Sequence, residues 1–211
     1  MNSQLSMHIS HIILALMMVL TLIQRKTRKK ALSRKPADFI IDTISLAAHF
    51  FIVPAVAFFA IHAIQKYVPS ENLGFIRGPG ILIFIVGLVV VDYFWYWNHR
   101  LFHADTWFWN LHEVHHNAKV FDVFMSARNT VWSPLLMIYV WFAVIATLVL
   151  ENPNWFVAAS AFGLVINFWG HTSFGPKPGS LLHKSLRMVF ITPHEHSWHH
   201  SSDSNLSLIH I

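Results

Sequence analysis

Histidines recur at metal-ligand spacing in three stretches of this chain. They are His99 and His103, spaced i, i+4, then His112, His115 and His116, and finally His196, His199 and His200, the last two sets each spaced i, i+3, i+4. On a helix these spacings place the imidazoles on one face, within reach of a shared metal ion. Two HxxHH patterns rarely arise by chance at this histidine content, so the spacing predicts a metal site.

The ligand inventory restricts the metal chemistry. The chain has 16 histidines and no cysteine, which excludes thiolate zinc, iron–sulfur and thiolate haem sites built from this chain alone. Eight or nine imidazoles exceed the four ligands of one tetrahedral zinc, so two metal ions are implied. Imidazole suits Zn, Cu, Fe and Ni alike. Iron is favoured only because a dinuclear, oxygen-activating centre would explain a metal site at the base of membrane spans.

The composition indicates that membrane helices must position these histidines. Hydrophobic residues make up 55% of the 211 residues and charged residues only 12%, whereas ordinary soluble domains are about one quarter charged. The net charge of +5 is therefore better matched to anionic lipid headgroups than to nucleic acid. We expect no nucleic-acid partner.

Five apolar stretches approach the length of about 20 residues that a membrane-spanning helix needs. They are Leu5–Ile23, Phe39–Ile64, Gly80–Trp97, Val131–Leu150 and Trp155–Trp169. Pro54 is expected to kink the second stretch, and Pro134 to occupy the first turn of the fourth. The predicted fold is all-α, a polytopic membrane bundle of about four to five spans with a His-rich, two-metal helical cap.

Basic residues predict the orientation of the bundle. Seven lie between the first two stretches: Arg25, Lys26, Arg28, Lys29, Lys30, Arg34 and Lys35. The positive-inside rule places this loop in the cytoplasm. Threading the spans from there puts residues 65–79 outside. All the histidines named above, and His171 after the last stretch, then fall on the cytoplasmic face of an integral, multi-pass membrane protein.

The order of these motifs resembles the fatty acid hydroxylase/sterol desaturase superfamily of membrane di-iron enzymes. The three sets of spaced histidines are called here the first box (His99 and His103), the second box (His112, His115 and His116) and the third box (His196, His199 and His200). The resemblance rests on these boxes and on the residues around them: Asp92 and Tyr96 ahead of His99-Arg100, Arg128 after the second box, a lone His171, and Thr192-Pro193 ahead of the third box. It covers Gly80 to Asp203. Ser197 departs from the family, in which an arginine is common at this position.

The resemblance implies a site, a reaction and a domain division. The implied ligands of two iron ions are His99, His103, His112, His115, His116, His171, His196, His199 and His200. The implied reaction is O2-dependent hydroxylation or desaturation of a lipid, such as a fatty acyl chain or sterol, in lipid biosynthesis. Residues 80–205 would form the catalytic domain, truncated relative to the family, and residues 1–79 an N-terminal membrane anchor region.

Several polar residues near the boxes receive separate expectations. Asp92 is expected to hydrogen-bond a ligand imidazole and fix its tautomer, with Tyr96 as a further supporting residue. His194 is expected at the surface, with a role as an extra ligand or hydrogen-bond donor to a ligand as the alternative, and His183 is expected in a solvated loop. No flavin or nicotinamide fingerprint is present, so electrons would come from a separate donor. By analogy with the family, this donor would be a ferredoxin or a b-type cytochrome with its reductase.

Two alternatives from other classes stay open. A His-rich membrane metal transporter would need polar groups threaded through its spans, and a bis-imidazole haem protein would use two histidines per haem. Separately, we expect Leu206–Ile211 to be a non-native tail. One back-translation of these six residues matches the end sequence that transposase-based library kits attach to DNA fragments.

Overall fold

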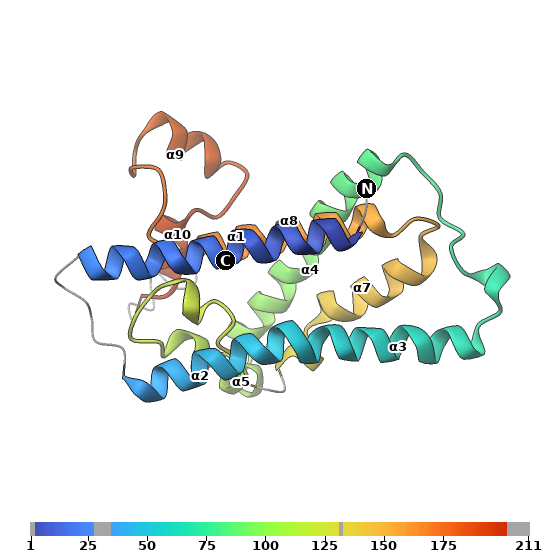
Figure 1. Cartoon of the computed structure of the whole chain (residues 1–211), viewed down its shortest axis with the longest axis horizontal. Coiled ribbons are helices and arrows are strands. Elements are labelled where there is room, and N and C mark those ends of the chain that lie inside the picture. Colours follow the sequence, from blue (N-terminus) through green and yellow to red (C-terminus); the bar gives the residue numbers. More distant parts are fainter. Residues whose placement is uncertain (1–2, 28–34, 131–132, 202–211) are drawn as a thin grey trace.

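The computed structural model describes residues 3–27, 35–130 and 133–201 (Figure 1), and the suspected tail at 206–211 lies outside them. The described residues are helical and contain no strand, which confirms the predicted all-α class. The α-helices are α1 (Ser3–Thr27), α2 (Pro36–Ala47), α3 (Val53–Tyr67), α4 (Gly80–Ala104), α5 (Thr106–His116), α6 (Ser133–Leu136), α7 (Ile138–Val149), α8 (Asn154–Gly170), α9 (Leu181–Leu186) and α10 (Pro193–His199).

In the part of the chain that the structure describes, two helical segments are long and apolar enough to cross a membrane. They are Pro36–Tyr67, which joins α2 to α3, and Gly80–Ala104, which is α4. His11–Ile23 and Ile138–Val149 are shorter apolar helices. Large apolar side chains on these segments face outward, with Phe51 75% and Val89 65% exposed. Such surfaces are stable in lipid rather than in water. The number of spans stays a prediction.

Local backbone geometry modifies two of the predicted helices. A π-helical turn, Ala48–Ile52, precedes Pro54, and the Val53 N–H donates to the Ala48 carbonyl across it. The stretch Val131–Leu150 was expected to form one helix. The structure instead breaks it at Met137, which adopts an extended ψ of 107°. The Ile138 N–H donates to the side-chain oxygen of Asn98 at 3.0 Å. The Asn98 side chain of α4 thus satisfies an N–H group that has no carbonyl partner within α7.

Helix α8 is central to the packing, since it lies against both α1 and α4. Figure 1 shows α1 and α8 side by side. Gly87 permits α4 to approach closely, because a Cβ at this position would lie 3.2 Å from both the Ala159 Cβ and the Phe156 ring. Leu14 and Phe168 belong to the buried cluster beneath α1.

One end of the bundle contains paired loops, and the other contains the helices that carry the histidines. At one end the loop before α4 pairs with the turn before α8, since the Gly74 N–H donates to Leu148 and the Glu151 N–H to Ile76. Residues 65–79, which include the first of these loops, were predicted from the sequence to lie outside. Figure 1 shows α5 and α10 toward the other end, where α1 ends and α2 begins. The histidine boxes therefore lie at one end of the bundle.

Candidate metal centre

Four segments deliver the histidines that the sequence singled out. His99 and His103 occupy the last turns of α4, and α5 carries the second box. Asp105 begins α5 by accepting from the N–H groups of Trp107 and Phe108, so its capping sets the start of this helix. His171 follows α8, and α10 carries the third box.

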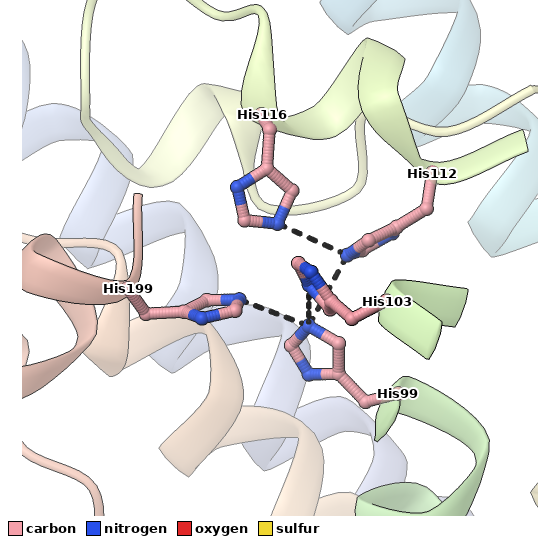
Figure 2. Close-up of side chains that lie close together, drawn as sticks. All are labelled: His99, His103, His112, His116 and His199. Carbon is pink, nitrogen blue, oxygen red and sulfur yellow. Dashed lines mark hydrogen bonds between the residues drawn. The ribbon is translucent and has the colours of Figure 1, made fainter. Parts of the chain in front are cut away.

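The structure brings all nine predicted ligands into two groups of ring nitrogens. The first group is His99, His103, His112, His116 and His199, and the second is His115, His171, His196 and His200. Within each group the potential ligand atoms lie within 4.8 Å of one another. Figure 2 shows the first five rings converging on a common centre. The second and third boxes each contribute to both groups, so the two sites share the same helices.

Nitrogen separations in the groups match those around a metal ion. His99 Nε2 lies 3.1 Å from the Nε2 atoms of His103, His112 and His199. Ligand nitrogens at about 2.1 Å from one ion would be about 3.0 Å apart at right angles and about 3.4 Å apart in a tetrahedron. One ring nitrogen carries a single proton or a single lone pair. It therefore cannot hydrogen-bond three such neighbours, whereas a shared cation satisfies all of them.

The ring nitrogens of the second group lie equally close together. His171 Nε2 lies 3.1 Å from His115 Nε2 and 2.9 Å from His196 Nε2. Both ring nitrogens of His200 are buried and have no hydrogen-bond partner within residues 3–27, 35–130 and 133–201. Buried polar atoms left without a partner are costly. A metal ion bound here would remove that cost, so these residues fit one.

Two asparagines fix the orientation of ligand rings. His171 Nδ1 lies 2.9 Å from the carbonyl oxygen of Asn167, and His112 Nδ1 lies 3.5 Å from the side-chain oxygen of Asn129. A carbonyl oxygen only accepts, so Nδ1 of each ring carries the proton and Nε2 presents its lone pair to the group. Sequence reasoning missed Asn129, because no spacing rule connects it to the boxes.

Replacing Asn129 with leucine is expected to weaken metal binding at the first group by about 10- to 100-fold, as loss of an outer hydrogen-bond partner commonly does. The leucine removes the acceptor that holds the His112 ring. Asn129→Asp keeps an acceptor oxygen and is the matched control. Competition with a chelator of known affinity measures the change, and equal affinities of the two variants would contradict this role.

Burial keeps the imidazoles neutral. It lowers the pKa of His112 from 6.5 to about 3 and that of His171 to about 4, with neighbouring histidines acting in the same direction. Burial likewise lowers the pKa of His115, His196 and His200 well below 6.5. Neutral rings are the form that binds metal. The site is therefore ready for a cation at neutral pH.

The same shifts predict that the metal-free protein loses stability in acid. Below pH 6.5 the histidines of the unfolded chain bind protons, whereas the buried rings of the folded chain stay neutral. The free energy of unfolding is therefore greatest above pH 6.5 and falls as the pH drops toward the folded pKa values. The loss between pH 7 and pH 5 is up to about 2 kcal/mol for each such ring. Denaturation of chelator-treated protein at the two pH values measures it. His112→Gln should give a shallower dependence, and equal stability at both values would refute the prediction.

Four further polar residues that were singled out from the sequence lie outside the two histidine groups. Asp92 is exposed on α4 and makes no hydrogen bond with a histidine among the described residues. The Tyr96 hydroxyl accepts from Arg100 at 2.8 Å. The expectation for His183 was wrong, because it is buried, with Nε2 3.1 Å from Glu195 Oε1. His194 is half-buried beside the Trp198 ring and belongs to neither group.

The fold and site define a helical protein with membrane-length helices and two histidine groups suited to metal binding. The profile of the fatty acid hydroxylase family matches residues 84–209, and the chain belongs to this family. The predicted membership is thereby confirmed. The match contains all nine histidines.

Relatives of known activity are similar over part of the chain. Alkylglycerol monooxygenases of Danio rerio and Homo sapiens are each 28% identical to it, over 110 and 111 residues respectively. The alignments cover 52% of this chain and 23% of each relative. The chain thus matches about a quarter of the length of these proteins. No solved structure matches it.

Proposed function

We propose that the chain carries the metal centre of a membrane lipid monooxygenase that holds two iron ions and uses O2 as co-substrate. The observation that carries the proposal is the gathering of nine histidines into two groups inside the region of family similarity. The monooxygenase activity of the relatives supports hydroxylation over desaturation. The cytoplasmic face, the multi-pass topology and the division at residue 80 belong to this proposal.

The protein groups have distinct roles in this mechanism. Each iron ion would be held by the imidazoles of one group, and the ions supply the activation of O2 and the oxidising power that an unactivated C–H bond requires. Asn129 and Asn167 keep two ligand rings in their binding tautomer. Within residues 3–27, 35–130 and 133–201 both groups consist of histidines alone, so these ligands would bring no negative charge to the ions. Electrons would come from a separate ferredoxin or b-type cytochrome.

A small cavity borders the first group on the side of α4 and α7. Its volume is about 30 Å³, and it is lined by Trp95, Asn98, His99, Phe102, Met137 and Tyr139. This volume is enough for a molecule the size of water or O2 and too small for an acyl chain. We propose that the lipid chain enters by displacing side chains at the α6–α7 break. The aromatic lining would then exclude water around the reacting carbon.

The test is lipid analysis of membranes from a host that expresses the protein with a reductase system. A product heavier by one oxygen atom, labelled when 18O2 is supplied, supports the proposal, and loss of two hydrogens indicates desaturation instead. Alkylglycerol ethers are the first substrates to offer, followed by fatty acyl lipids and sterols. Absence of O2-dependent products from all three classes, in protein shown to contain iron, would reject it.

A further inference from the structure

Residues 176–191, here called the α9 segment, form a surface that the proposed function does not use. Figure 1 shows α9 standing to one side of the α1 and α8 layer, at the end where α10 lies. Its large apolar side chains face outward, with Met188 84%, Leu181 82%, Val189 74% and Leu182 61% exposed. Four large apolar residues gathered in one short segment mark a binding surface.

The charge of the segment is entirely positive. Lys177, Lys184 and Arg187 are exposed, and residues 176–191 contain no aspartate or glutamate. Exposed apolar side chains combined with basic ones are typical of elements that lie in the interface of an anionic bilayer. Each basic residue near such a surface adds electrostatic attraction to its anionic headgroups.

Buried contacts hold the segment in a fixed orientation on α10. His183, on the inner face of α9, has its Nε2 3.1 Å from Glu195 Oε1, and Arg187 Nε lies 3.7 Å from the same oxygen. Thr192 donates to the other Glu195 oxygen. The Ser180 hydroxyl oxygen accepts from the His183 N–H and so begins α9. With His183 facing inward, Leu181 and Leu182 are directed outward.

We propose that the α9 segment is an interfacial membrane element: Leu181, Leu182, Met188 and Val189 lie among acyl chains, and Lys177 and Lys184 contact anionic headgroups. Helix α1 also exposes apolar side chains, including Leu16 and Leu22, as expected of a protein whose helices face lipid. Through Glu195 this contact also sets the depth of α10 and its histidines at the bilayer. The proposal does not depend on iron or on catalysis.

The chain has no native cysteine, so single-cysteine labelling tests the proposal directly. Leu182→Cys and Met188→Cys are labelled with an environment-sensitive fluorophore in the full chain, reconstituted into vesicles of phosphatidylcholine and phosphatidylglycerol. Glu71→Cys, exposed at the opposite end of the bundle, is the control. Circular dichroism verifies that each variant is folded.

Labels at Leu182 and Met188 are expected to be quenched severalfold more by lipid-borne nitroxides than the label at Glu71, and to be shielded from aqueous iodide. Lys177→Glu with Lys184→Glu should reduce the quenching in anionic vesicles. Iodide quenching equal to that of the Glu71 label would overturn the proposal. Shielding from both quenchers would overturn it too, because protein rather than lipid would then cover the segment.

Discussion

His112→Ala is expected to remove the metal ion of the first group and to lower activity by more than about 100-fold. His112 Nε2 lies 3.1 Å from His99 Nε2 and 3.2 Å from His116 Nε2, so it stands between ligands of two helices. Losing an outer partner of a ligand already costs up to about 100-fold, and losing a ligand costs more. His199→Ala is expected to behave in the same way, because His199 links α10 to the same group.

The two groups make a sharper form of this prediction possible. His112→Ala should leave the second group with its metal ion, whereas His171→Ala should empty the second group first. His194→Ala is the matched control, since this histidine lies in the third box but in neither group. Metal analysis and product formation are measured on the same samples. Full metal content and activity in His112→Ala and His199→Ala would contradict the ligand assignment.

Asp42→Ala is expected to cost about 3–5 kcal/mol of stability, the range found when one partner of a buried ion pair is removed. Asp42 is 1% exposed and accepts from Arg128 Nε. Arg128 is 4% exposed, so the substitution leaves its guanidinium charge buried without that partner. The pair joins α2 to the residues just after the 3-10 turn Val123–Met125.

The same substitution should disturb the metal centre through the backbone. Arg128 precedes Asn129, whose side chain holds His112 and whose carbonyl accepts from Ser45 of α2. Asp38→Ala is the matched control, because the Asp38 side chain is 20% exposed and lies 3.3 Å from Arg128. Thermal unfolding in lipid nanodiscs compares the variants. A loss of stability in Asp42→Ala no larger than in Asp38→Ala would show that the buried pair is not structurally important.

The histidine ligands could be predicted from sequence because their spacing is regular. Their division into two groups could not be predicted in this way. The i, i+3, i+4 pattern places His112, His115 and His116 on one helix, but helical periodicity alone does not assign His115 to a different group from its neighbours. That division depends on the crossing of α5 with α10, which is a tertiary property. Asn129 likewise holds the His112 ring through a contact that no local pattern encodes, whereas the Asn167 carbonyl lies only four residues before His171 at the end of α8.

Tertiary contacts explain the two places where expectations from the sequence were wrong. His183 was expected in a solvated loop, yet its side chain is buried and lies against the buried Glu195 of α10. The helix predicted over residues 131–150 was inferred from hydropathy, which does not register that Asn98 of α4 would bond the Ile138 N–H and start a new helix there. In the second case a polar contact between residues 40 positions apart decided the local structure.

The two histidine groups are proposed to hold two non-haem iron ions. Metal analysis of the protein purified from native-like membranes, together with its absorption spectrum, tests this assignment. We expect about two iron ions per chain and no Soret band, and about one iron ion per chain in His112→Ala. Zinc as the only bound metal, or a haem spectrum, would contradict it and favour the transporter or haem-protein alternatives.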